Sequence, residues 1–164
     1  MIAPIRPRAT TIAAVFWLYV GPSWVFAGSV MVLTSVALVE QMPGMDYAAL
    51  DILPLFFLAL LVCGLFGIAG ALRLLALHER GRDNVERASW AAVTIIMVFT
   101  LRWAYGTAMF SYGRNTFLGT WDRVGPAVGG MAVGALAALP FLLTALMLRK
   151  PAVRSAIRSA QLRG

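Results

Sequence analysis

The stretch ILPLFFLALLVCGLFGIAGAL, residues 52–72, contains no charged side chain. As a helix, a run of about 20 apolar residues crosses the roughly 30 Å hydrocarbon core of a bilayer. A small soluble domain keeps a large fraction of its surface in water, so a chain of 164 residues has no interior in which to bury several runs of this kind. The stretch therefore predicts a transmembrane helix.

Three more stretches of the chain meet the same criterion. Residues 11–39 and 124–148 are uncharged, and residues 88–113 carry only Arg102. Apolar residues make up 60% of the chain and charged residues 13%, with a mean hydropathy of +0.80, whereas soluble domains are about a quarter charged. We predict an all-α, integral membrane four-helix bundle forming one domain over residues 1–150, followed by a tail over residues 151–164.

The distribution of basic residues predicts the orientation, because cytoplasmic segments carry the excess of Lys and Arg. The N-terminal segment, the middle loop between the second and third spans, and the C-terminal segment are predicted to lie on the same side of the membrane. Its basic residues are Arg6, Arg8, Arg73, Arg80, Arg82, Arg87, Arg149, Lys150, Arg154, Arg158 and Arg163. The other side has only Arg114 and Arg123. We expect a multi-pass protein of a bacterial plasma membrane with both termini in the cytoplasm.

The first span is longer than a crossing needs, since residues 11–39 would reach about 43 Å as a straight helix. Gly21 and Pro22 provide a place for a bend, because proline removes a backbone hydrogen bond and crowds the preceding turn. Two arrangements remain open. One is a single long, kinked helix, and the other is an interfacial helix over residues 9–20 followed by a span over residues 22–39.

The tail has the pattern of a short amphipathic helix. Pro151 suits a first helical position, and apolar residues recur at helical spacing at Val153, Ala156, Ile157 and Ala160. We expect the basic residues Arg149, Lys150, Arg154 and Arg158 to bind anionic lipid of the inner leaflet; a solvated tail is the alternative. The formal charge of +7 is thus assigned to a membrane surface and not to nucleic acid.

Small residues at four-residue or similar spacing predict close helix contacts, because they let two backbones approach. The fourth span has Gly130, Gly134 and Ala138 on one face, and Gly125 and Gly129 mark a second stripe on another. The second span has Gly64, Gly67 and Gly70. The spacing does not say whether these contacts lie within one chain or between chains.

Arg102 is the one charge well inside a predicted span, and a charge in hydrocarbon is a functional candidate by default. It lies about 21 Å along the helix from Ala88, near the outer headgroups. A structural role, by snorkelling or by an intramembrane polar pair with Glu40 or Asp51, is preferred. A polar pathway or a ligand contact is the alternative.

Motifs for catalysis and for cofactors are missing. The sequence has no phosphate-binding loop, dinucleotide fingerprint, nucleophile elbow or metal-spaced histidines. Cys63 and His78 are each the single residue of their type, which excludes an intrachain disulfide and paired axial ligation of a haem. We expect no enzymatic activity, no cofactor and no bound metal.

The chain resembles the small four-span membrane proteins, some of them holin-like, of actinobacterial phages or their high-GC hosts. The resemblance covers the compact four-span layout, one lysine against thirteen arginines, the phrase Leu101-Arg102-Trp103-Ala104-Tyr105-Gly106 and the basic tail. It implies a holin-like protein that associates with itself in the membrane. It assigns no functional residue.

Three functions are compatible with these features. The first is the holin-like, self-associating membrane protein, supported by glycine-rich helix faces. The second is an accessory or structural subunit of a larger membrane complex. The third is a small channel or transporter, which is supported only by Arg102 and its neighbours. The partners expected are the bilayer, anionic lipid, and either further copies of the chain or a larger complex.

The predicted orientation is testable by labelling single introduced cysteines in intact cells. A cysteine between Met42 and Ala48 should react with a membrane-impermeant thiol reagent, and one between Glu79 and Asn84 should react only after lysis. The native Cys63 should stay unlabelled in both cases, since it lies inside a span. The reverse labelling pattern would overturn the orientation.

Overall fold

The computed structural model describes residues 8–41, 52–114 and 120–162, and over these ranges the chain is helical with short turns and no strand. The helices are α1 (Arg8–Gln41), α2 (Ile52–Leu75), α3 (Glu79–Arg114), α4 (Thr120–Arg149) and α5 (Pro151–Gln161). In four of them, residues 8–34, 54–75, 79–106 and 124–149 are long and apolar enough to cross a membrane. The all-α class and the four candidate spans are therefore confirmed.

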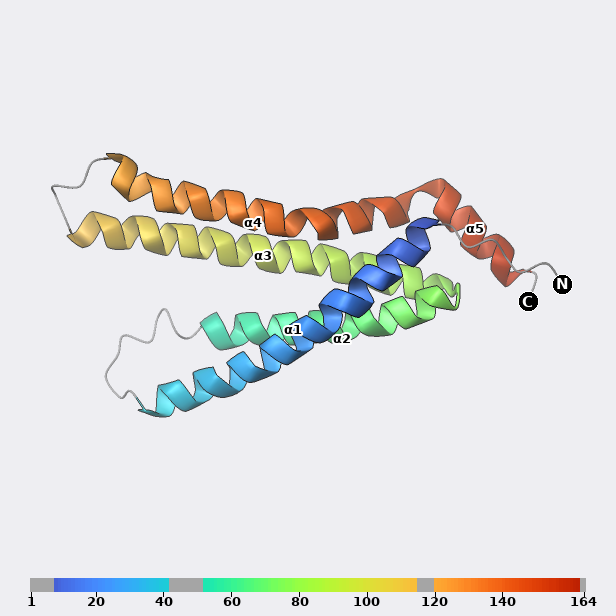
Figure 1. Cartoon of the computed structure of the whole chain (residues 1–164), viewed down its shortest axis with the longest axis horizontal. Coiled ribbons are helices and arrows are strands. Elements are labelled where there is room, and N and C mark those ends of the chain that lie inside the picture. Colours follow the sequence, from blue (N-terminus) through green and yellow to red (C-terminus); the bar gives the residue numbers. More distant parts are fainter. Residues whose placement is uncertain (1–7, 42–51, 115–119, 163–164) are drawn as a thin grey trace.

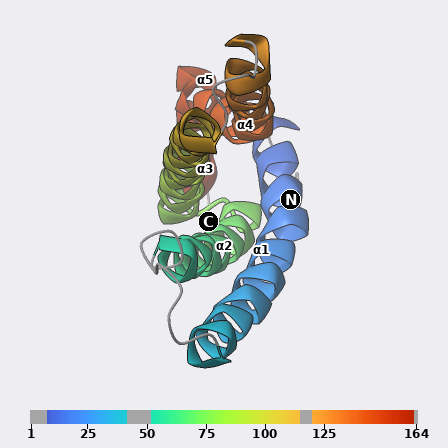
Figure 2. The ribbon, with the colours of Figure 1, turned by 90° about the vertical axis from the view of Figure 1, so that its left-hand side faces the viewer.

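The four long helices form two antiparallel hairpins, α1 with α2 and α3 with α4, joined along α2 and α3 (Figure 1). The start of α1, the α2–α3 connection and the end of α4 lie at one end of the molecule, which we call the charged end. From there α1 runs obliquely away from α4 and finishes beyond α2, so the hairpins diverge toward the other end (Figure 2). The tight part of the bundle is the half next to the charged end.

The first span is one continuous helix that includes Pro22. It corresponds to the first of the two arrangements left open by the sequence. Gly21 lies where α1 crosses α2, and a Cβ at this position would come within 2.6 Å of Cγ1 of Ile68 and 3.1 Å of the carbonyl oxygen of Gly64. The residue before the proline therefore allows close approach of the two helices.

Trp17 lies at the centre of the tight half and is fully buried. Its indole N–H donates a hydrogen bond of 2.9 Å to Oγ of Ser89 on α3. On α2, the ring occupies the space above Gly67, where a Cβ would lie 2.7 Å from Cδ2 of the indole. On α4, the ring of Phe141 packs edge-on at a centroid distance of 5.6 Å. One side chain of α1 thus contacts all three other long helices.

The connection between α2 and α3 is a tight turn and not the long inner loop expected from the four arginines between the spans. Leu77 adopts a left-handed conformation with φ of 56°. The N–H of Leu77 donates to the carbonyl of Leu74 at 2.9 Å, and the N–H of His78 donates to that of Arg73 at 3.0 Å. These are the two bonds of a Schellman motif, which satisfy the last carbonyls of α2.

Gly81 lets α3 begin directly after this turn. A Cβ at Gly81 would lie 2.6 Å from the carbonyl carbon of Arg73 and 2.8 Å from its Cβ. A side chain would therefore push the first turn of α3 away from the last turn of α2. The consequence is that Arg80, Arg82 and Arg87 are helical residues at the start of α3.

The six small residues predicted for helix packing all lie at helix contacts or in the interior of this chain. A Cβ at Gly64 would lie 2.8 Å from the carbonyl oxygen of Gly21, Gly67 lies under Trp17, and Gly70 faces Asn84 and Val85. On α4, Gly130 lies against the ring of Trp103, Gly134 lies against Thr100, and Ala138 is buried. Five of these positions therefore serve contacts between helices of the same chain.

Replacing Gly134 by leucine should loosen the α3–α4 hairpin. A Cβ at this position would already lie 2.8 Å from Cβ of Thr100, so a leucine needs the helices to separate. Overpacking of this kind costs about 1–3 kcal/mol. Ala135→Leu is the control, because Ala135 is exposed on the same helix. Thermal melting in mild detergent measures both; a Gly134 variant that melts with the parent would contradict the assignment.

Candidate functional site

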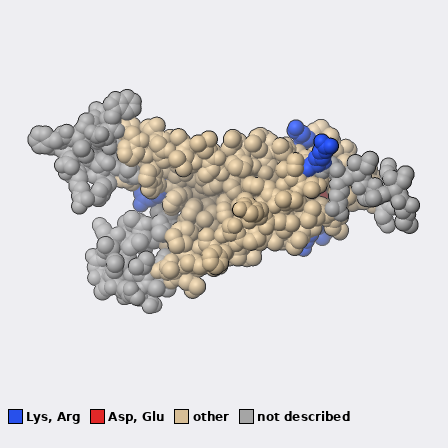
Figure 3. Space-filling model, in the orientation of Figure 1, with Lys and Arg blue, Asp and Glu red and all other residues tan. Residues whose placement is uncertain are grey.

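Charged side chains gather mainly at the charged end of the molecule. On the face shown in Figure 3, the middle is formed by uncharged residues, and the basic side chains appear only toward the two ends. This distribution fits a protein whose middle lies in hydrocarbon and whose charged end lies at headgroup level.

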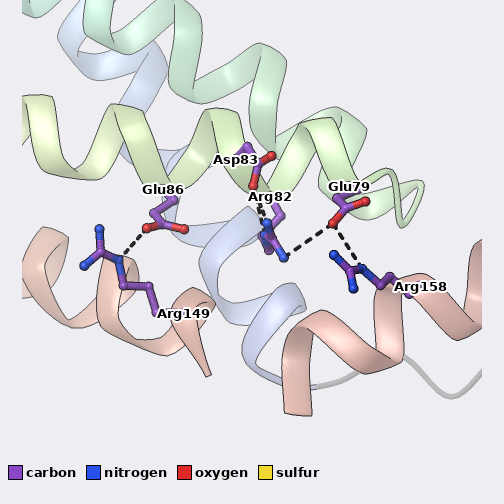
Figure 4. Close-up of polar contacts among 6 residues, drawn as sticks. All are labelled: Glu79, Arg82, Asp83, Glu86, Arg149 and Arg158. Atoms are coloured by element: carbon purple, nitrogen blue, oxygen red, sulfur yellow. Dashed lines mark hydrogen bonds and ion pairs between the residues drawn. The ribbon is translucent and has the colours of Figure 1, made fainter. Parts of the chain in front are cut away.

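Charged residues at the start of α3 join this helix to the C-terminal part of the chain; Figure 4 shows Glu79, Arg82, Asp83 and Glu86. Glu86 accepts a hydrogen bond from Nε of Arg149 at the end of α4. Oε1 of Glu79 lies 3.5 Å from Nε of Arg158 on α5 and 3.9 Å from Nη1 of Arg82. The carboxylates of α3 are therefore positioned to hold α4 and α5.

Arg82 is the buried member of this cluster, and its guanidinium binds the adjacent Asp83 through Nε and Nη2. Arg149 also lies over the ring of Trp90, with 5.1 Å between its Cζ and the ring centroid. A cation over an indole face adds about 0.5–1 kcal/mol at exposed sites. The carboxylates Glu79, Asp83 and Glu86 each have an arginine partner, an arrangement suited to holding helices together.

The tail forms the expected amphipathic helix, but its apolar side lies against the bundle. Val153 and Ile157 of α5 are buried and join the hydrophobic core that contains Trp17. Of the four residues predicted to bind anionic lipid, Arg149 and Arg158 face Glu86 and Glu79 of α3. Lys150 and Arg154 are exposed and have no ion pair with any residue in the described ranges. The tail is thus both a packing element and a basic surface.

The predicted polar pair of Arg102 with Glu40 or Asp51 lies outside what the structure describes, because the side chain of Glu40 and the whole of Asp51 are not among the described residues. Arg102 itself is exposed on α3, next to Trp103. The pairing therefore stays a prediction.

A groove runs between α2 and α3, and sequence reasoning did not anticipate it. Its volume is about 520 Å³, and its walls include Leu58, Val62, Phe66, Ala91 and Ile95. At its charged end the lining changes to Asn84 and Arg87. A second hollow of about 260 Å³ shares Leu55, Ala59 and Ile95 with the first and reaches Val98 and Phe99. The groove is thus apolar along its length and polar at one end.

Cys63 lines the groove and is buried, and its thiol donates a hydrogen bond of 3.2 Å to the carbonyl oxygen of Ala88. Such a buried, hydrogen-bonded thiol contributes to packing between α2 and α3. Within the described ranges no three His, Cys, Asp or Glu side chains are grouped so that they could hold a metal ion. The groove is therefore suited to binding an apolar or amphiphilic molecule.

No protein-family model, curated protein or solved structure matches this chain. Its function is therefore inferred from the residues and their arrangement.

Docking of α5 on the bundle is testable by hydrogen exchange. Ile157→Ala should detach α5, because truncating a fully buried isoleucine costs about 2–5 kcal/mol. Leu162→Ala is the matched control, since Leu162 is 88% exposed. Amide exchange over residues 152–160 should rise in the first variant and stay at the parental rate in the second. Equal protection in both variants would mean that α5 is not held by this contact.

Proposed function

We propose that the chain is a non-enzymatic integral membrane protein that associates with further copies of itself through one face of α4. The observation that carries the proposal is the open space at Gly125 and Gly129. Apart from the neighbouring residues and backbone of α4 itself, no described atom would come within 4 Å of a Cβ at either position. The remaining glycines of α4, Gly130 and Gly134, are covered by α3.

The free face lies on the side of α4 opposite its contact with α3. At 100° per residue, Gly125 and Gly129 point away from the direction of Gly130 and Gly134, and the exposed side chains of Val133 and Leu136 continue the same stripe. The sequence Gly125-Pro126-Ala127-Val128-Gly129 has the small-xxx-small spacing that brings two helices close in a membrane. Its exposure supports a contact with another chain.

For such a self-associating membrane protein, the sequence resemblance favours a holin-like role. In such a role many copies assemble and permeabilise the inner membrane. Two features support it: the open glycine stripe, which allows repeated association, and the position of Gly125 and Gly129 within the fourth candidate span.

An accessory subunit of a larger membrane complex is the second candidate, and α1 favours it. Its exposed face carries large apolar side chains at a strict seven-residue spacing, namely Ile12, Tyr19, Phe26 and Leu33. With the exposed Val15, three residues after Ile12, this spacing matches part of the heptad pattern at the seam between two supercoiled helices. Because each of these side chains is more than half exposed, the stripe is available to a helix of another protein.

The two candidates are separated by replacing Gly129 with leucine. If α4 is the self-association face, the parent runs as a ladder of homomers on a native gel from mild detergent, and conditional expression depolarises the membrane. Gly129→Leu should weaken association about tenfold or more, equivalent to about 1.4 kcal/mol, and abolish depolarisation. Ala135→Leu, which adds the same side chain on an exposed position off the stripe, should behave like the parent.

An accessory subunit gives a different result. The parent would then migrate in a large complex with other proteins, expression would leave the membrane potential unchanged, and Gly129→Leu would have no effect. Equal melting temperatures of the Gly129 variant and the parent would show that the substitution leaves the bundle intact, as the open space around Gly129 predicts.

A further inference from the structure

The groove between α2 and α3 has the length of one lipid leaflet. Together with the second hollow, its lining on α3 extends from Asn84 to Phe99, and the part beyond the polar Asn84 and Arg87, from Ala88 to Phe99, covers about 17 Å along a helix. Half of the hydrocarbon core is about 15 Å. The groove therefore starts at headgroup level and ends near the middle of the membrane.

The occupant of such a groove has to be apolar over most of its length. Between Leu55 and Phe66 on α2, and between Ala88 and Ile95 on α3, every residue that lines the larger hollow is apolar or is the hydrogen-bonded Cys63. Its volume of about 520 Å³ lies in the range of ligand pockets. A flexible hydrocarbon chain fits this lining, and an extended peptide with unpaired backbone amides does not.

At the charged end of the groove, Arg87 is a cation without an acidic partner among the described residues. Arg82, Arg149 and Arg158 each lie against a carboxylate, whereas the exposed Arg87 makes no hydrogen bond or ion pair with any other described residue. Asn84, which also lines the groove, is one turn earlier on α3 and adds amide donors. A guanidinium with a neighbouring amide is suited to the oxygens of a phosphate group.

We propose that this groove is a binding site for an anionic diacyl phospholipid, with its phosphate at Arg87 and Asn84 and one acyl chain along the apolar lining. Arg87 faces no carboxylate among the described residues, so its uncompensated charge favours a lipid with net negative charge over a zwitterionic one. The site is separate from the basic tail. It is also separate from the free face of α4, so it does not depend on self-association.

The test uses the full chain, purified in mild detergent with equal amounts of phosphatidylglycerol and phosphatidylcholine, and counts bound lipids by native mass spectrometry. The parent should retain phosphatidylglycerol in preference to phosphatidylcholine. Arg87→Gln should lower that preference about tenfold, the effect of one charge-assisted contact. Arg80→Gln is the matched control, since it removes the same charge from an exposed position that does not line the groove.

Two further variants fill the groove. Ala91→Phe and Ala59→Phe each place a ring where the acyl chain lies, one from each wall, and should abolish retention of both lipids. Ala135→Phe adds the same ring on an exposed part of α4 and should retain lipid like the parent. Circular dichroism checks that each variant keeps its helices.

The proposal is overturned if Arg80→Gln and Arg87→Gln lower retention equally, because lipid would then respond to overall charge. It is also overturned if a folded groove-filling variant retains phosphatidylglycerol like the parent. Oligomeric state is measured in the same spectra, so loss of self-association in Gly129→Leu and loss of lipid in Arg87→Gln are read separately.

Discussion

The position of Trp17 determines how the helices of this protein pack. An indole in an apolar interior needs a partner for its N–H, and Ser89 of α3 provides it at 2.9 Å. The flat ring needs an equally flat neighbour, and Gly67 of α2 provides that. These two requirements hold the start of α1 on α2 and α3, and Phe141 brings α4 to the same point. The helices are therefore tightly packed in this half and diverge beyond it.

The sequence predicted the four spans well because their length and lack of charge follow from the thickness of the hydrocarbon. It failed at the start of α3, where charged residues were interpreted as a loop. Glu79, Arg82 and Glu86 lie at the end of a candidate span, where charge is compatible with a helix. Helical spacing of these charges was the available signal, but the left-handed Leu77 that ends α2 has no signature in the sequence.

The pattern of small residues predicted close packing without identifying the partner. Gly125 and Gly129 have the same spacing as Gly130 and Gly134, so spacing alone does not rank the two stripes. The difference arises on α3, where Thr100 and Trp103 cover only one of them. The same holds for α5. The helical spacing of its apolar residues was evident from the sequence, but the burial of Ile157 depends on the core formed by distant helices. The groove at Arg87 likewise requires two helices to be positioned together.

The tight turn between α2 and α3 also constrains how this protein enters the membrane during synthesis. Only residues 76–78 connect the two helices, and three extended residues span about 10 Å. The end of α2 and the start of α3 are therefore held close together from the time this turn is made. When α3 enters the membrane after α2, it enters directly beside the helix against which it packs. Lengthening this turn would loosen that guidance before it altered the finished fold.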